Sequence, residues 1–229
     1  MLKLQNYSVA YGQSNVIHDL QLDVGENEIV AVVGRNGMGK TTLMKSMVGM
    51  VPAREGVLSM QGVDLMPLKS HQRVKAGLGF VPQGRMIFPT LTVKENIETG
   101  LAASGRKGIP ADLYELFPVL KDMASRKGGN LSGGQQQQLA IARALATDPK
   151  VLILDEPTEG IQPSIIQELA RTLRKIRDTR GLSILVSEQV LSFVMNVADR
   201  ILVIEKGRFV HQEEREGANQ EKIAAYLAV

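Results

Sequence analysis

Residues 28–41 read EIVAVVGRNGMGKT, and this stretch decides the fold. Its first half is an apolar, β-branched run of the kind found in parallel strands that are covered on both faces. A glycine-rich turn follows at once, and residues 40–49 suit a helix. The turn fits the pattern of glycine, four residues, then Gly-Lys-Thr, in the strand–turn–helix context that the pattern requires. The stretch therefore predicts a phosphate-binding loop between a buried strand and a helix.

The chemistry of this loop depends on groups that bind phosphate. Its glycines let backbone N–H groups converge on phosphate oxygens, and the helix N-terminus adds about half a positive charge. We expect Lys40 to reach the terminal phosphates of a nucleotide and the Thr41 hydroxyl to bind Mg²⁺. The predicted nucleotide-binding residues of the loop are Gly34, Arg35, Asn36, Gly37, Met38, Gly39, Lys40, Thr41 and Thr42.

Two adjacent carboxylates, Asp155 and Glu156, follow a second apolar run at residues 151–154. They therefore stand at the carboxyl end of a predicted strand, where α/β sheets bind ligands. In phosphate-loop ATPases an aspartate at this place holds Mg²⁺ through water, which is the role expected for Asp155. Glu156 is then the candidate that orients and polarises the attacking water. An acidic pair after a strand is otherwise often only a solvated or helix-capping pair, so this prediction depends on the loop at residues 34–41.

The third motif is LSGGQ at residues 131–135. Ser132 is a good N-cap for a helix that continues to residue 146, and Gly133 and Gly134 permit a close approach to its N-terminus. Such a helix end is a second anion site. The nucleotide held by the phosphate-binding loop of the same chain does not need this second anion site.

These three motifs, in this order, resemble those of the ATP-binding-cassette (ABC) family, and the resemblance covers nearly the whole chain. It implies an ATPase that uses ATP and Mg²⁺, with Thr41, Gln83 and Asp155 at the metal. It also implies a head-to-tail dimer that sandwiches two ATP molecules. In that dimer Ser132, Gly133, Gly134 and Gln135 face the γ-phosphate held by the second subunit. A phosphate-loop kinase or GTPase would lack the motif at residues 131–135.

The resemblance assigns three more residues. Tyr11 matches the aromatic residue that stacks on adenine, although a lone Tyr in a strand is more often half-buried packing. Gln83 matches a glutamine that touches Mg²⁺ and the attacking water and leads into a helical subdomain. Gln189 stands where most relatives have a switch histidine. It can donate a hydrogen bond to a γ-phosphate but cannot carry charge. A register shift of one residue would place Glu188 there instead.

The loop after Glu156 also departs from most relatives, because residues 159–163 read EGIQP and lack an aspartate. Together with GRNGMGKTT at 34–42, QGRMIFP at 83–89 and the glutamines at 135–138, it resembles the branched-chain amino acid and urea uptake branch. The likeness is greatest to the ATP-binding subunit of a urea transporter. The expected function is ATP hydrolysis that energises an importer of a small polar solute, urea above all. The alternatives are a branched-chain amino acid importer and a soluble, non-transport ABC ATPase acting on ribosomes or in DNA repair.

Composition limits the partners of the 229-residue chain. Hydrophobic residues make up 44% and charged residues 22%, with a net charge of +3 and 0 Cys, which excludes disulfides, thiolate metal sites and a dense nucleic-acid-binding arm. No run approaches the ~18 apolar residues of a membrane span. We therefore expect a cytoplasmic protein bound to the inner face of the membrane through two permease subunits. A second ABC ATPase subunit, identical or paralogous, and indirectly a solute-binding protein complete the expected partners, without nucleic acid.

The alternation of predicted strands and helices indicates an α/β fold with a mostly parallel core sheet. Residues 2–10 and 16–24 predict an antiparallel β layer before it, and residues 54–82 are expected to form short strand-like pieces. Approximately residues 84–150 are expected to be a helical subdomain inserted in one nucleotide-binding domain that spans 1–229. After it, residues 163–180 predict a helix, and 183–187 and 201–204 predict strands.

Overall fold

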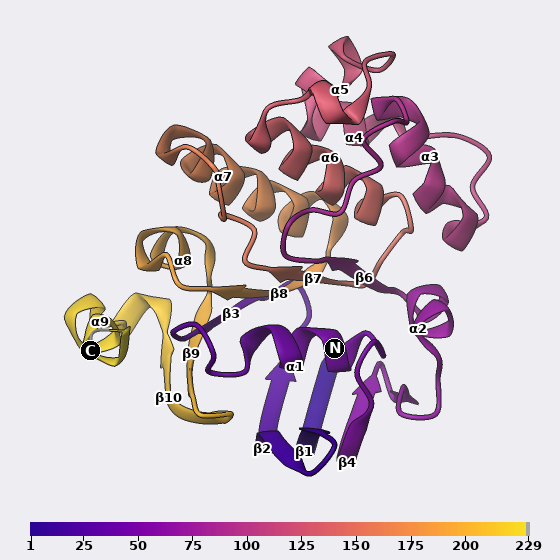
Figure 1. Ribbon diagram of the computed structural model, residues 1–229. Coiled ribbons are helices and arrows are strands. Elements are labelled where there is room, and N and C mark those ends of the chain that lie inside the picture. Colours follow the sequence, from indigo (N-terminus) through magenta and orange to yellow (C-terminus); the bar gives the residue numbers. More distant parts are fainter. Residues whose placement is uncertain (228–229) are drawn as a thin grey trace.

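The computed structural model describes residues 1–227. Its centre is a six-stranded sheet in the order β10-β9-β3-β8-β7-β6 (Figure 1). β3 pairs in parallel with β8 and β9, and β7 pairs in parallel with β6 and β8, whereas β10 is antiparallel to β9. The strands are β3 (Ile29–Val33), β6 (Leu78–Val81), β7 (Val151–Asp155), β8 (Ser183–Glu188), β9 (Arg200–Glu205) and β10 (Arg208–Glu214). The predicted α/β class with a mostly parallel sheet is confirmed.

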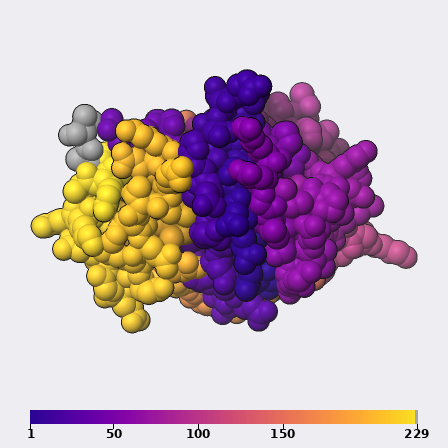
Figure 2. All heavy atoms as spheres, turned by 90° about the horizontal axis from the view of Figure 1, so that it is seen from below, coloured from indigo at the N-terminus to yellow at the C-terminus, as the bar shows by residue number. Residues whose placement is uncertain are grey.

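A four-stranded antiparallel sheet, in the order β2-β1-β4-β5, lies beside this core. Its strands are β1 (Leu2–Tyr11), β2 (Ser14–Val24), β4 (Ala53–Met60) and β5 (Val63–Asp64). Figure 2 shows the N-terminal strands between the C-terminal segment and the segment that follows α1. The backbone N–H of His18 donates to the carbonyl of Gly207 at 3.0 Å, so β2 is also joined to the turn between β9 and β10.

Helices cover both faces of the core sheet. In Figure 1, α1 lies between the two sheets, and α3 to α7 lie on the other side of the core sheet. The chain from α3 to α6 is the segment between β6 and β7. The helices are α1 (Lys40–Met47), α2 (Ser70–Ala76), α3 (Val93–Ser104), α4 (Ala111–Leu116), α5 (Pro118–Asp122), α6 (Gly133–Leu145), α7 (Pro163–Arg180), α8 (Leu191–Val197) and α9 (Gln220–Leu227), with 3₁₀ turns η1 (Gly128–Asn130) and η2 (Arg215–Gly217).

β3 separates two hydrophobic cores. Ile29, Ala31 and Val33 pack into the cluster formed with α6, α7 and α8. Val30 and Val32 pack into the cluster formed with α1 and the antiparallel sheet. Because successive side chains of a strand point to opposite faces, a strand buried on both sides must be apolar at every position. This explains the uninterrupted apolar run that opens the fold.

Helix α2 was not predicted, and the expectation of short strand-like pieces across residues 54–82 is wrong there. The helix has few apolar side chains to reveal it in the sequence. Its buried Arg73 donates to the carbonyl oxygens of Ser46 at 2.9 Å and Met47 at 2.7 Å, at the end of α1. A helix C-terminus leaves carbonyl groups without partners, so Arg73 satisfies them from a distant segment. The tertiary contact thus stabilises a helix that local pattern does not mark.

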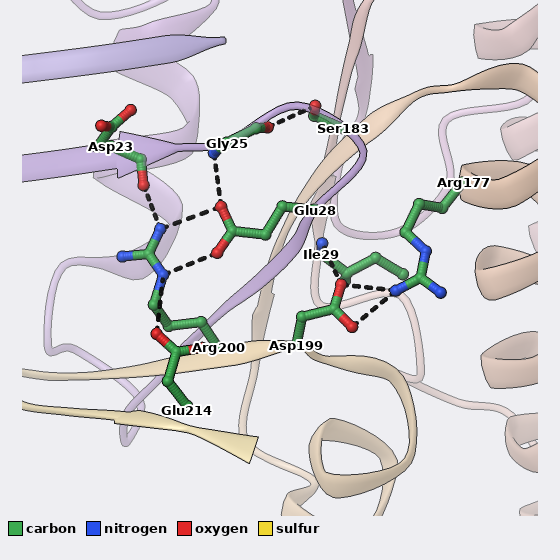
Figure 3. A network of polar contacts seen from close by, with 9 residues as sticks. All are labelled: Asp23, Gly25, Glu28, Ile29, Arg177, Ser183, Asp199, Arg200 and Glu214. Atoms are coloured by element: carbon green, nitrogen blue, oxygen red, sulfur yellow. Dashed lines mark hydrogen bonds and ion pairs between the residues drawn. The ribbon is translucent and has the colours of Figure 1, made fainter. Parts of the chain in front are cut away.

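A polar network joins the amino-terminal ends of the core strands (Figure 3). Arg200 Nε donates to Glu28 Oε1 at 2.8 Å, and this hydrogen bond raises the pKa of Arg200. Asp199 accepts a hydrogen bond from the N–H of Ile29 at 2.8 Å and from Arg177 of α7 at 2.7 Å. The network therefore links α7 to the first residues of β3 and β9. These lie at the edge of the sheet opposite to the carboxyl ends of the strands.

Candidate functional site

The carboxyl ends of β3, β7 and β8 meet at one edge of the core sheet. Val33 is paired with Glu188 in the β3–β8 register, and Asp155 is paired with Ser187 in the β7–β8 register. The residues that follow these strands therefore emerge side by side. This places the phosphate-binding loop, Glu156 and Gln189 at the same edge, where parallel α/β sheets bind ligands.

A pocket of about 300 Å³ opens at this edge. It brings together the loop, Gln83 after β6 and Glu156 after β7, as the sequence predicted for a nucleotide site. It also includes Val16 of β2, which sequence reasoning missed because nothing in a half-polar strand marks it. The lining residues are Val16, Asn36, Gly37, Gly39, Lys40, Thr41, Thr42, Gln83 and Glu156.

Lys40 is held inside the loop by three oxygen atoms. Its Nζ donates to the carbonyl of Gly34 at 2.7 Å and to that of Arg35 at 3.1 Å, and it lies 3.1 Å from Glu156 Oε1. Both side chains of the Lys40–Glu156 ion pair are buried. An ammonium group has three donors, and here each has an acceptor. The positive charge of Lys40 therefore faces the pocket while it is paired with Glu156.

Asp155 offers one free oxygen atom beside the loop. Its Oδ1 accepts hydrogen bonds from Ser187 Oγ at 2.6 Å and Thr41 Oγ1 at 3.2 Å. Its Oδ2 is buried and has no hydrogen-bond partner among residues 1–227. Burial raises the pKa of Asp155, and the bonds from Ser187 and Thr41 oppose this effect. A buried carboxylate oxygen without a partner, on a residue that also accepts from the Thr41 hydroxyl, fits the oxygen ligands that Mg²⁺ prefers.

Glu156 has a left-handed backbone with a φ of 46°. This conformation is costly for a residue with a Cβ and persists only where the surroundings enforce it. Here the Glu156 N–H donates to the carbonyl of Ser187 at 3.0 Å, which holds the turn against β8. The turn directs the carboxylate of Glu156 toward Lys40 and the pocket.

Gln189 and Glu188 have different surroundings. Glu188 is buried, and its carboxylate accepts hydrogen bonds from Thr158 and from the N–H groups of Gln189 and Val190. Gln189 is exposed and lines a second pocket of about 330 Å³ together with Arg35, Asn36 and Leu227. This geometry supports the register with Gln189 beside the loop, and its catalytic role remains a prediction.

The residues at 132–135 form a separate surface and do not line the pocket around Lys40. Ser132 caps α6 as expected, since its Oγ accepts from the N–H of Gln135 at 3.4 Å while Gln135 Oε1 accepts from the N–H of Ser132 at 2.9 Å. Tight packing also favours glycine at positions 133 and 134. A Cβ on Gly133 would lie 3.0 Å from the Gly160 carbonyl, and one on Gly134 would lie 2.8 Å from Ile165 Cγ2.

Tyr11 lies apart from the pocket lining. It is the last residue of β1, paired with Ser14 across the β1–β2 hairpin, and the residue is 51% exposed. Val16 of the same hairpin lines the pocket, whereas Tyr11 is not among the lining residues. Stacking of Tyr11 on adenine stays a prediction.

Arg85 is a residue of this region that sequence reasoning did not single out. Its Nη2 donates to the carbonyl of Glu159 at 2.7 Å and to that of Gly160 at 3.3 Å, in the loop after Glu156. Arg143 of α6 donates to the Arg85 carbonyl at 3.2 Å, and its guanidinium lies 5.3 Å from the centre of the Phe88 ring. Arg85 therefore joins the segment after Gln83 to the segment after Glu156. Only its place two residues after Gln83 could have drawn attention to it.

Among residues 1–227, no helix combines the length and the apolar character that crossing a membrane requires.

Comparisons with known proteins agree with this geometry. The sequence pattern of the ABC transporter family matches residues 17–159. The chain is 37% identical to the high-affinity branched-chain amino acid transport ATP-binding protein BraG of Pseudomonas aeruginosa, covering 92% of this chain and 91% of that protein. It is 33% identical to the lipopolysaccharide export system ATP-binding protein LptB of Escherichia coli, over 91% of this chain and 88% of that protein.

A solved structure is similar over the same length. It is the dimeric, post-hydrolysis state of an ATP-binding cassette bound to ADP and Pi, with a TM-score of 0.84, 26% identity, and coverage of 95% of this chain and 100% of that chain. The phosphate-binding loop, the carboxylates after β7 and the family match together establish that the chain belongs to the ABC transporter family and is an ATPase with the ATP-binding-cassette fold.

Proposed function

We propose that this ATPase energises a membrane importer of a small polar solute. The observation that carries the proposal is the pocket in which Lys40, Gln83 and Glu156 converge, with Gln189 at the adjacent edge. Urea is the first candidate solute, because QGRMIFP at 83–89 and EPTEGIQPS at 156–164 resemble the urea transporter subunit. Branched-chain amino acids are the second, supported by the similarity to BraG and to a probable LivF protein of Archaeoglobus fulgidus, at 33% identity.

The proposed reaction uses the side chains of the pocket in separate roles. Loop N–H groups and Lys40 bind the β- and γ-phosphates of ATP. Thr41, Gln83 and Asp155 would hold Mg²⁺, which would neutralise phosphate charge. Glu156 orients and polarises the attacking water, and the Gln189 amide donates a hydrogen bond to the γ-phosphate. The orphaned Oδ2 of Asp155 supports the metal assignment.

The second ATPase subunit is proposed from the position of Ser132. This N-cap is exposed and lies outside the pocket of its own chain, so a second anion-binding helix end is left for another nucleotide. In a head-to-tail dimer, residues 132–135 of each subunit would meet the ATP on the loop of the other. The second subunit is a copy of this chain or a paralogue.

The membrane partners are proposed to bind an apolar groove of about 700 Å³ beside the segment after Gln83. Met86 and Phe88 in it are exposed, and Val74 and Phe80 lie on the walls. Ile87, by contrast, packs against the large core, so its side chain serves packing. We expect the groove of each ATPase subunit to hold one helix from one of the two permease subunits. The chain would then sit on the cytoplasmic face of the membrane, and would meet a solute-binding protein only indirectly and no nucleic acid.

Reconstitution tests this proposal. The membrane proteins that co-purify with the chain would be identified and placed with it in liposomes, and ATP-dependent uptake of labelled urea and of labelled leucine would be measured. Uptake of urea or leucine that is lost when Glu156 is replaced supports the importer proposal. Sedimentation of the chain with ribosomes, without membrane partners, would favour the soluble alternative, and movement of solute or lipid only outward would favour an exporter.

A further inference from the structure

Glu188 ends β8 and is 1% exposed, yet it lies outside the residues that line the nucleotide pocket. Each oxygen of its carboxylate serves a different loop. Oε1 accepts from the N–H of Thr158 at 3.0 Å and from the Thr158 hydroxyl. Oε2 accepts from the N–H of Gln189 at 2.8 Å and from that of Val190 at 3.0 Å. One buried side chain thus joins the loop after β7 to the loop after β8.

The donors to Glu188 are three backbone N–H groups and one hydroxyl. Charge-assisted bonds of this kind are stronger than bonds between neutral groups, and they satisfy a carboxylate that water does not reach. A carboxylate is required because both of its oxygen atoms are acceptors, so that one can accept from each loop. A glutamine has one oxygen and one NH₂ group, so its NH₂ would face an N–H of one loop.

Both joined loops carry groups with a proposed part in hydrolysis. Thr158 stands two residues after Glu156, whose left-handed backbone depends on the surrounding contacts. Gln189 is bonded to Glu188 directly. We infer that Glu188 is a positioning residue that fixes Gln189 relative to Glu156, so that the γ-phosphate donor and the water-orienting carboxylate are aligned together. The inference rests on the proposed role of Gln189 and does not depend on the transported solute.

The test uses the purified chain and Glu188→Gln. We expect kcat for ATP hydrolysis to fall by up to about 10²-fold while KM for ATP stays within about twofold, because misplacement by 1 Å can cost this much and the loop around Lys40 is untouched. Ser183→Ala is the matched control. Ser183 is buried at the other end of β8, where its hydroxyl donates to the Gly25 carbonyl at 2.7 Å. It should lower the melting temperature without changing kcat.

A double-mutant cycle separates positioning from general destabilisation. If Glu188 acts through Gln189, the variant Glu188→Gln with Gln189→Ala should have the kcat of Gln189→Ala alone within about twofold. The inference would be overturned if the kcat losses of the two single variants multiplied in the double variant. It would also be overturned if either Glu188→Gln or Gln189→Ala kept the wild-type kcat. The importer proposal would survive all three, since it is decided by solute uptake.

Should Glu188→Gln fail to fold by circular dichroism, the same cycle is run with Thr158→Val. This variant removes the hydroxyl donor to Glu188 and keeps the Thr158 N–H. A smaller fall in kcat that disappears in the Gln189→Ala background would support positioning. A fall that persists in that background would overturn it.

Discussion

Lys40 Nζ lies 3.1 Å from Glu156 Oε1, with only 3% and 8% of the two side chains exposed. The two residues follow different strands, β3 and β7, and meet across the pocket that is lined by both. Burying an ion pair costs desolvation energy that the attraction only partly offsets. The terminal phosphates of ATP are stronger acceptors for Lys40 than one carboxylate. Their charge-assisted hydrogen bonds with Lys40 form in addition to those that the loop N–H groups donate to the same phosphates. ATP binding is therefore expected to take Lys40 away from Glu156 and leave that carboxylate free for water.

Replacement of Glu156 by Gln is expected to abolish turnover and to leave ATP binding at least as tight. Loss of one well-placed catalytic group costs ~10²–10³ in rate, while the competing carboxylate at Lys40 is removed. ATP should then trap a dimer, which size-exclusion chromatography detects. Glu159→Gln changes an exposed acid in the same loop and serves as the control. Turnover near wild type in Glu156→Gln would remove Glu156 from the catalytic role.

Replacement of Lys40 by Ala is expected to weaken ATP binding and to destabilise the nucleotide-free chain. Glu156 would remain as a buried charge without its partner, which typically costs about 1–3 kcal/mol or more. Adding Glu156→Gln to Lys40→Ala should restore part of this stability but no ATP binding. Urea denaturation and equilibrium nucleotide binding measure both effects. Additive losses of stability in the double variant would contradict the coupling of the two residues.

Gln189→Ala is expected to slow hydrolysis severely, whereas Gln189→His should retain substantial activity. The reason is that a hydrogen-bond donor to the γ-phosphate suffices if Glu156 already orients the water. Steady-state ATPase rates of the two variants are the measurement. If both variants were equally slow, the geometry of the amide and not its donor would matter, and wild-type turnover in Gln189→Ala would remove the residue from the mechanism.

Ser132→Arg is expected to spare ATP binding by the single chain and to prevent ATP-driven dimerisation. The side chain at the exposed N-cap would occupy the surface proposed for the phosphate of the other subunit, while the pocket around Lys40 is not touched. Sedimentation of the variant with ATP, in a Glu156→Gln background that accumulates the dimer, is the measurement. Normal dimers would contradict the head-to-tail sandwich.

Phe88→Asp is expected to release the chain from membranes while the ATPase activity of the purified chain survives. The exposed Phe88 lines the apolar groove, and a carboxylate there would have to lose its water when a permease helix binds. Val210→Asp alters another exposed apolar residue, on β10, and is the control. Co-sedimentation with membranes compares the two. Loss of folding in Phe88→Asp, seen by circular dichroism, would indicate a packing role instead.

Features that depend on residues close in the sequence could be predicted, whereas features that depend on contacts between distant segments could not. The strand–loop–helix unit at residues 28–47 and the Ser132 cap depend on neighbours in the chain, so composition and spacing revealed them. Helix α2 depends on Arg73 reaching the end of α1, and no periodic pattern marks it. Val16 was missed because its place in the pocket results from sheet packing.

The sequence by itself determined the α/β class, the phosphate-binding loop and the identity of the residues at each strand end, because these depend on periodicity and on motifs of adjacent residues. Only the tertiary structure decided which of these residues meet: Lys40 with Glu156, Arg85 with the loop after Glu156, and Glu188 with both Thr158 and Gln189. Each contact joins loops that follow different elements. The register of the parallel strands sets their distances, and the short-range pattern of one segment contains no information on that register.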